Sequence, residues 1–486
     1  MTRAFRSSTN GLPLLLLLVG VATGLISACA DDGPGRGSGS DTPDVVEAGD
    51  VGGDAVDPGD TGDDVVPPPD VGSDSGADAG TGEDADAGTD TGTDTGTTPS
   101  RCDSFPIQAR FGDEIEEGGA WVSHNFLRCV RSAHVMVVPR GTTWSIEAER
   151  LPPGTRIDVY PSFYFDYEEE LAPLPAPLAS SGAATINGRL SLEFTGLYGG
   201  EHVVVLTNPD PRRQTVYEIR ADCVGECQRV TTRYPIVLIH GFLGLDNYFG
   251  LLDYWHDMIP AMRARGTEVF NTAADPINSS QVRSAQHWEQ IDGFRTTTGA
   301  RRVNLIAHSQ GGLDSRIIAS PGGLDHGDRI ASITTIATPH GGVEIPLLEL
   351  ISDLANAIFA FPDFSQRTAA EFNAQYVDSP QTRYWSWSFR TCASIDIICR
   401  VNSGGEVVDS LLSVFHALVI LGGGGDNDGL VSVSSARWGE HLGTRWADHM
   451  DEIGQIADPR PPLHTEPFRH RDFYQAEIDR LIAAGY

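Results

Sequence analysis

The chain has no lysine at all, so its 34 basic residues are all arginine. The arginines are scattered and form no basic stripe, which argues against nucleic-acid binding. Against them stand 67 acidic residues, and the formal net charge is −33. Residues 31–100 hold 19 of these acids and only Arg36 as a base, so this segment alone contributes −18. The acidic total therefore describes this segment more than the rest of the chain.

Aromatic residues are also missing from residues 29–100, which consist almost wholly of Asp, Gly, Thr, Ala, Pro, Val and Ser. Such a composition cannot bury enough apolar surface to offset the entropy lost on ordering, and like charges keep the chain extended. We predict a disordered Asp/Gly/Thr-rich tether over 29–100. Calcium binding by its Asp repeats is the alternative interpretation.

Residues 1–28 have the layout of a lipoprotein signal peptide. Two arginines give a positive start, a short apolar run follows, and small residues precede Cys29. The run is too short and too interrupted by glycine for a comfortable membrane span. Residues 26–29, Ile-Ser-Ala-Cys, resemble a bacterial lipobox, in which the cysteine is lipidated. We expect an exported protein that reaches the membrane surface through lipidated Cys29, at the bacterial outer membrane or cell surface. Plain secretion is the alternative.

Cysteine is scarce, and the six residues beyond Cys29 fit disulfides in an oxidising compartment. Cys392 and Cys399 lie seven positions apart and far from the others, so we predict that they pair. The sequence leaves open the pairing of the other four, which are Cys102, Cys129, Cys223 and Cys227.

Residues 101–229 contain short runs in which polar and apolar residues alternate, separated by turn residues such as Gly199-Gly200. The runs are 144–148, 190–194, 202–206 and 216–220. This pattern is typical of a small all-β sandwich. No cluster in it suggests catalysis, so we expect an accessory domain that binds or spaces, or a simple structural cap.

From Tyr234 onward continuous apolar runs replace the alternation. They cover 235–239, 303–307 and 333–337, as in strands buried on both faces, and helical stretches cover 255–265 and 280–297. Strands that alternate with helices predict an α/β fold, with a mostly parallel sheet covered on both faces, over residues 230–486.

The second apolar run leads into Ala307-His308-Ser309-Gln310-Gly311, with a helix expected to begin near Gly311. Ser309 would lie at the tip of a sharp turn between strand and helix, where the residues two before and two after must be small. The usual pattern has glycine at the first of these positions, and Ala307 is a sterically mild departure. Ser309 is therefore the predicted nucleophile.

The first strand ends in His240-Gly241-Phe242, which is where an oxyanion loop is expected. We assign the two oxyanion donors to the backbone N–H groups of Phe242 and Gln310. Each such donor stabilises a transition state by roughly 3 kcal/mol.

A nucleophilic serine needs a histidine base and a carboxylate that orients it, and in this fold their order along the chain is Ser, acid, His. Spacing alone does not choose among the downstream histidines, which are His326, His340, His416, His441, His449, His464 and His470.

Residues 234–486 resemble the secreted true lipases of the Pseudomonas–Burkholderia type. The matching segments keep their order: 234–241, 243–247, 253–255, 303–309, 337–340, 372–376, 384–388, 427–431 and 449–452. The resemblance implies an α/β-hydrolase fold and a triacylglycerol lipase that acts on lipid or ester substrates, with Asp428 as the triad acid and His449 as the base. Taken alone, Asp428 would be an ordinary Asp-Gly turn and His449 a surface histidine.

The same resemblance implies a structural calcium ion near the catalytic histidine and no organic cofactor. Its ligands would come from Asp409, Asp451, Gln455 and a backbone carbonyl near Pro459, and oxygen donors suit Ca²⁺. The alternative is a solvated acidic loop.

Many of these lipases need a membrane foldase, so a foldase is a possible partner. Their disulfide is missing here, because no cysteine lies near Ser434.

Residues 343–364 form the candidate lid. Their leucines and isoleucines recur at near-helical spacing, which suits a helix that covers an acyl-binding cleft and equally suits a core helix. Two other functions stay open: a carboxylesterase or polyester depolymerase with the same triad, and a cell-surface binding protein without catalysis.

Overall fold

The computed structural model describes residues 102, 107–115, 118, 120–165, 174–242, 247–248, 252–255, 257–276, 278–345, 365–392, 408–409, 412–455 and 468–486. The expected signal peptide, the lipidation site Cys29, the tether, Cys399, Pro459 and most of the candidate lid lie outside these residues. No helix in the described part is long and apolar enough to cross a membrane.

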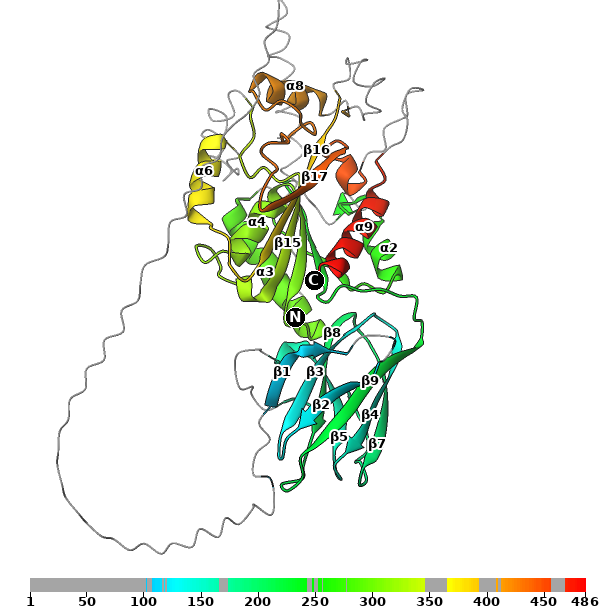
Figure 1. The fold of residues 1–486 in the computed structure, drawn as a ribbon. Helices are drawn as coiled ribbons and strands as arrows, with labels where there is room; N and C mark the ends of the chain where they lie inside the picture. The colour runs from blue at the N-terminus through cyan, green and yellow to red at the C-terminus, as the bar shows by residue number, and fades with distance from the viewer. Residues whose placement is uncertain are drawn as a thin grey trace, which may run out of the picture. The chain divides into compact units, whose positions relative to one another are not determined.

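Two sheets fill residues 107–225 (Figure 1). One has the order β1 (Ile107–Glu114), β3 (Arg131–Val138), β8 (Gly200–Thr207), β5 (Arg156–Pro161) and β6 (Ala179–Ser180). The other has the order β2 (Val122–Phe126), β9 (Thr215–Gly225), β4 (Thr143–Leu151) and β7 (Gly188–Thr195). All pairs are antiparallel except β1 with β3.

Alternation along the strands explains this sandwich. In β4 the side chains of Trp144, Ile146 and Ala148 are buried, and the residues between them are partly exposed. The buried set meets Val204 and Leu206 of β8 in one apolar core. The four strands expected from the sequence are confirmed as β4, β7, β8 and β9.

Two disulfides belong to this region, and they resolve the pairing that the sequence left open. Cys102 is bonded to Cys129, and Cys223 to Cys227. Cys392 is also a disulfide cysteine, but its expected partner Cys399 is not among the described residues.

A second region carries a six-stranded sheet whose strands are all parallel. Its order is β13 (Val269–Asn271), β10 (Ile236–Ile239), β14 (Val303–His308), β15 (Ile330–Ile336), β16 (Arg383–Arg390) and β17 (Glu440–Trp446). Because the strands are parallel, the loops after β10 and β14 leave the same edge of the sheet, where ligands bind in open α/β folds.

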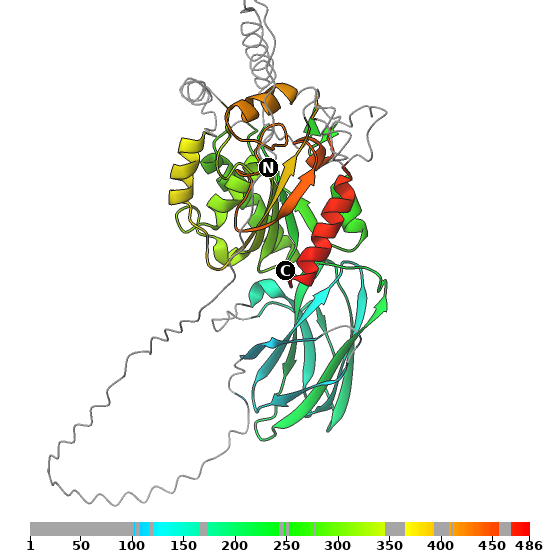
Figure 2. The same ribbon diagram turned by 45° about the horizontal axis from the view of Figure 1, so that its top comes forward.

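Helices cover both faces of this sheet, as Figures 1 and 2 show. Those on one face are α3 (Ser280–Thr298) and α4 (Gln310–Ala319), and those on the other are α2 (Met258–Ala264) and α9 (His470–Ala483). Strand β10 explains the division: Ile236 and Leu238 share a core with α2 and α9, whereas Val237 and Ile239 share one with α3 and α4. The expected α/β fold is confirmed.

Some details differ from the sequence prediction. The helix expected from Trp255 begins only at Met258. Trp255 is 4% exposed and packs edge-on against Tyr474 of α9. Its side chain is therefore part of the core, although its backbone lies before the first turn of the helix. Two further helices, α6 (Gln366–Gln375) and α8 (Ser413–Leu421), follow β15 and precede the loop that carries Asp428.

Candidate active site

Ser309 lies between β14 and α4 in a strained backbone conformation. Its φ of 54° and ψ of −130° fall in a region that residues with side chains rarely adopt. Two bonds fix the turn: Ser309 N–H donates to the Ile336 carbonyl at 2.9 Å, and the Thr338 hydroxyl donates to the Ser309 carbonyl at 2.8 Å. The turn therefore projects the Ser309 side chain from the carboxyl edge of the sheet.

Close packing behind the turn explains the small residues around Ser309. A Cβ on Gly311 would lie 2.6 Å from the Ile239 carbonyl oxygen and 2.7 Å from that of His240. Ala307 is completely buried in the sheet. The first turn of α4 thus sits directly on the end of β10.

The structure brings Ser309, His449 and Asp428 together. His449 Nε2 is 2.9 Å from Ser309 Oγ, and His449 Nδ1 is 2.9 Å from Asp428 Oδ2. Asp428 is fully buried and His449 is 5% exposed, so little water competes for these bonds. His464 lies outside the described residues; among the other histidines left open by spacing, His449, which the resemblance implies, is the one that meets the serine.

Asp428 is both the residue of an Asp-Gly turn and the acid of the triad, which the sequence analysis treated as alternatives. Its Oδ1 accepts the backbone N–H groups of Leu430 and Val431 at 2.8 and 2.7 Å, as in an Asp-Gly turn. Its Oδ2 is thereby directed to His449, and the His449 N–H donates to the Asp428 carbonyl at 2.9 Å. The turn is what aims the carboxylate.

The loop after β10 packs against the nucleophile. A Cβ on Gly241 would lie 2.6 Å from the Ser309 Cβ, so only glycine fits there. The guanidinium of Arg283 donates to the carbonyls of His240 and Gly241 at 2.7 and 3.2 Å. In a trans peptide the carbonyl and the next N–H point in opposite directions, so this bond turns the Phe242 N–H away from Arg283.

Gln310, the other expected donor, is the first residue of α4. The leading N–H groups of a helix have no partner inside it and favour negative charge. A Gln310 N–H beside Ser309 is thus available to an oxyanion.

Arg283 is itself held by a buried ion pair that sequence reasoning missed. Its Nε is 2.8 Å from Asp314 Oδ2, and both side chains are fully buried. The pair belongs to α3 and α4, so it links the oxyanion loop to the helix behind Ser309. Arginine and aspartate on separate helices carry no local signal of such a contact.

A second buried chain was also missed. The Gly241 N–H donates to Tyr254 Oη at 2.9 Å, Tyr254 Oη is 2.7 Å from His308 Nδ1, and His308 Nε2 is 3.0 Å from Glu452 Oε2. Burial lowers the pKa of His308 well below its usual value. Burial, and next the nearby Asp428 carboxylate, raise the pKa of Glu452 well above its usual value. These residues lie within segments that match the lipases, which was the available signal.

Comparison with known proteins agrees with this geometry. A family model described as the alpha/beta hydrolase fold matches residues 234–382. These residues have the α/β-hydrolase fold.

Curated relatives of this hydrolase carry lipase names. A triacylglycerol lipase of Vibrio cholerae is 27% identical over 297 residues, which cover 52% of this chain and 89% of the relative. One from Burkholderia plantarii is 26% identical over 319 residues, which cover 52% of this chain and 87% of the relative. Among solved structures, a metagenomic carboxyl esterase has 19% identity and a TM-score of 0.41, covering 53% of this chain and 77% of its own.

Two of the calcium ligands implied by the resemblance, Asp409 and Asp451, are bonded through their backbone N–H groups to the buried carboxylate of Asp448. Asp448 Oδ2 accepts the Asp409 N–H at 2.8 Å, and its Oδ1 accepts the N–H groups of Met450 and Asp451 at 2.9 and 3.0 Å. Asp448, which immediately precedes His449, therefore joins the loops that carry Asp409 and Asp451. Gln455 is buried nearby and donates to the Tyr254 carbonyl at 3.2 Å. Asp409 is 4% exposed, and a carboxylate is a ligand type that suits Ca²⁺.

One other cluster of the described residues has metal-ligand chemistry, with its ligand atoms within 4.8 Å of one another: His308, His449 and Glu452. It includes the histidine bonded to Ser309. A metal ion there would occupy the base, so the hydrogen-bonded arrangement is the functional one for this hydrolase.

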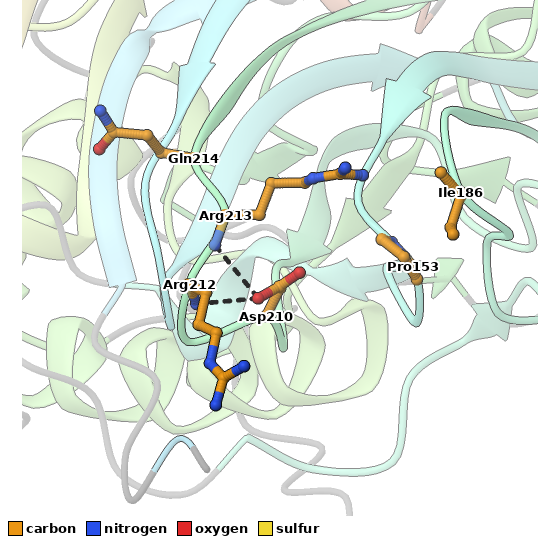
Figure 3. Close-up of a pocket in the computed structure, with 6 residues that line it drawn as sticks. All are labelled: Pro153, Ile186, Asp210, Arg212, Arg213 and Gln214. Carbon is orange, nitrogen blue, oxygen red and sulfur yellow. Dashed lines mark hydrogen bonds between the residues drawn. The ribbon is translucent and has the colours of Figure 1, made fainter. Parts of the chain in front are cut away.

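The sandwich region carries an open cavity of about 480 Å³ that shares no residue with the Ser309 site (Figure 3). It is lined by Pro153, Ile186, Asp210, Arg212, Arg213 and Gln214. Asp210 Oδ1 accepts the backbone N–H groups of Arg212 and Arg213 at 2.8 and 3.1 Å, which fixes the loop. The lining offers no serine, cysteine or histidine, and the carboxylate of Asp210 is engaged by the loop, so we place the chemistry at the Ser309 site.

Proposed function

We propose that this chain is a serine-dependent carboxylic ester hydrolase, and specifically a triacylglycerol lipase that releases fatty acids. The observation that carries the proposal is the hydrogen-bonded series Asp428–His449–Ser309, with both links at 2.9 Å. It places a nucleophile, a base and an orienting carboxylate in the geometry that acyl transfer requires.

In the first half of the reaction, Ser309 Oγ bonds to the ester carbonyl carbon as its proton passes to His449 Nε2. The carbonyl oxygen becomes an oxyanion and accepts hydrogen bonds from the N–H groups of Phe242 and Gln310. The carbon–oxygen bond to the alcohol then breaks, and His449 returns the proton to the leaving oxygen. The products are an acyl-serine and a free alcohol.

In the second half, His449 takes a proton from water as the water oxygen bonds to the acyl carbon. The intermediate collapses, the bond to Ser309 Oγ breaks, and His449 gives the proton back to the serine. The acid is released. Asp428 stays ionised and stabilises the imidazolium formed in each half.

The lipase assignment within ester hydrolases rests on the curated relatives, several of which are named triacylglycerol lipases. A carboxylesterase or polyester depolymerase would use the same residues on other acyl groups. The acyl-binding cleft and the segment expected to cover it therefore decide between them, and a substrate comparison separates them.

Four further properties belong to the proposal. Asp409, Asp451, Gln455 and a carbonyl near Pro459 would hold a calcium ion that stabilises the loop of His449 without taking part in the reaction. Cys29 would carry the lipid that anchors the protein at the cell surface, with residues 29–100 as the tether. The sandwich over 101–229 would serve as a binding or spacing module, and a foldase would assist folding.

The decisive experiment compares wild type and Ser309→Ala on p-nitrophenyl butyrate and on emulsified triolein. We expect the wild type to hydrolyse both and Ser309→Ala to hydrolyse neither. The matched control is Ser315→Ala in α4, whose hydroxyl donates only to the Gly311 carbonyl of its own helix at 2.7 Å. Activity on butyrate alone would identify an esterase, and equal rates for wild type and Ser309→Ala would identify a binding protein without catalysis.

A further inference from the structure

We propose that Tyr254 and His308 are positioning residues for the oxyanion loop, and that Glu452 holds them from the loop of the catalytic base. The inference rests on the proposed ester hydrolysis and deepens it. Its basis is one continuous buried chain of hydrogen bonds, Gly241–Tyr254–His308–Glu452, with lengths of 2.9, 2.7 and 3.0 Å.

The polarity of this chain is constrained at its first link. A backbone N–H can only donate, so Tyr254 Oη accepts from Gly241. A neutral imidazole has one donor and one acceptor nitrogen, so His308 donates at one end and accepts at the other. Either direction leaves every link made, and either direction needs both the Tyr254 hydroxyl and the Glu452 carboxyl.

Burial makes the chain rigid. Tyr254 is 5% exposed, His308 is 1% exposed and Glu452 is fully buried. A buried polar group that loses its partner cannot recover the bond from water, so these residues hold their positions together.

The chain ends where the reaction is most sensitive to position. Gly241 immediately precedes the proposed donor Phe242 and approaches Ser309 so closely that a Cβ would lie 2.6 Å from the serine Cβ. Tyr254 binds the N–H of Gly241, and Arg283 binds its carbonyl. Loss of either of these two hydrogen bonds to Gly241 would shift the Phe242 N–H relative to the oxyanion.

The other end joins the catalytic base. Glu452 is three residues after His449, and His308 immediately precedes Ser309, with the rings of His308 and His449 centred 4.5 Å apart. A single chain thus connects the oxyanion loop, the nucleophile turn and the loop of the base. We infer that it keeps the three in mutual register.

The test uses Tyr254→Phe, Glu452→Leu, Glu452→Gln and the double variant Tyr254→Phe/Glu452→Leu in the full chain, assayed with p-nitrophenyl butyrate. Because this series of hydrogen bonds positions a donor that stabilises the transition state, we expect Tyr254→Phe and Glu452→Leu each to lower kcat by about tenfold to a hundredfold. KM should stay within about threefold. Glu452→Gln, which can donate or accept, should keep kcat within about threefold of wild type.

Two readouts separate positioning from a merely structural role. The double variant should be no slower than the slower single variant, because both changes break one chain. The inhibition constant for n-butylboronic acid, which binds the serine as a charged tetrahedral adduct, should rise in step with the loss of kcat.

The matched control is Tyr474→Phe, which removes a hydroxyl that has no hydrogen-bond partner within the described residues. We expect its kcat to equal that of the wild type. The inference is overturned if Tyr254→Phe keeps full kcat, if Glu452→Gln is as slow as Glu452→Leu, or if only the melting temperature changes. A wild type that hydrolyses no ester would instead overturn the proposed function.

Discussion

Gly241 lies so close to Ser309 that a Cβ on the glycine would be 2.6 Å from the serine Cβ. The same Cβ would lie 3.0 Å from Tyr254 Oη, so neither neighbour can yield without breaking a contact of the site. We expect Gly241→Ala to lower kcat by about a hundredfold or more, because the oxyanion loop must retreat from the nucleophile. The control is Gly293→Ala in α3, where a Cβ has nothing within 4 Å and activity should be unchanged. Full activity of Gly241→Ala would show that the loop adapts.

Replacing Asp428 with asparagine tests the orientation of the base. An amide cannot balance the charge of protonated His449 and favours the wrong tautomer, so kcat should fall by about a thousandfold or more. Asp426→Asn is the matched control, because Asp426 is 66% exposed, two residues away, and paired with Arg390. Steady-state kinetics of both variants provide the measurement, and similar kcat values for the two would remove Asp428 from the triad.

The buried pair of Arg283 and Asp314 should matter for stability as well as activity. Arg283→Met would leave the Asp314 carboxylate buried without its cation, which costs about 3–5 kcal/mol in unfolding free energy. It would also release the Gly241 carbonyl. Arg329→Met at an exposed pair, with both side chains 46% exposed, should cost less than about 1 kcal/mol. Urea denaturation measures both, and equal costs would contradict this account.

Calcium should stabilise the loop of His449. If the site is filled at a hundredfold excess over its Kd, binding adds about 2.7 kcal/mol, which raises Tm by about 5 °C or more. Chelation with EGTA should remove this gain, and Asp451→Asn should abolish it. Asp472→Asn, at an exposed pair with Arg469, is the control. A calcium-dependent Tm that persists in Asp451→Asn would place the ion elsewhere.

Because His202 in β8 is buried, we expect the stability of the sandwich to fall at acid pH. Burial lowers the pKa of its imidazole to about 4, from an unfolded value near 6.5. Below pH 6.5 the unfolded chain binds a proton that the folded chain does not, so stability falls from pH 6.5 down to about 4. The loss from this group reaches about 3 kcal/mol. His202→Gln should flatten the fall in unfolding free energy between pH 7 and pH 4, and a parallel pH profile would contradict the assignment.

Much of the fold could be predicted because its signals are local. The apolar run at 235–239 predicts a strand buried on both faces, and the alternation at 144–148 predicts one buried on a single face. Both segments form strands in the structure. The start of α2 could not be predicted, because Trp255 fits a helical pattern yet packs against Tyr474 from the other end of the chain. Long-range packing overrides local preference at such positions.

The site divides in the same way. Ser309 has a local pattern of small neighbours, so the residues alone pointed to it. Asp428 and His449 needed the ordered resemblance, because nothing near them in sequence reports their contact. Five other residues act through partners on other elements, and no local sequence pattern indicates such contacts. They are Arg283, Asp314, Tyr254, His308 and Glu452.

The backbone of Ser309, at φ 54° and ψ −130°, carries a standing energetic cost even when no substrate is present. Glycine would adopt this conformation more easily, so the position that performs the chemistry is also one where the fold would gain from losing it. Selection for heat resistance alone would remove the serine, and selection for turnover retains it. A stabilised form of this hydrolase must therefore gain its stability elsewhere.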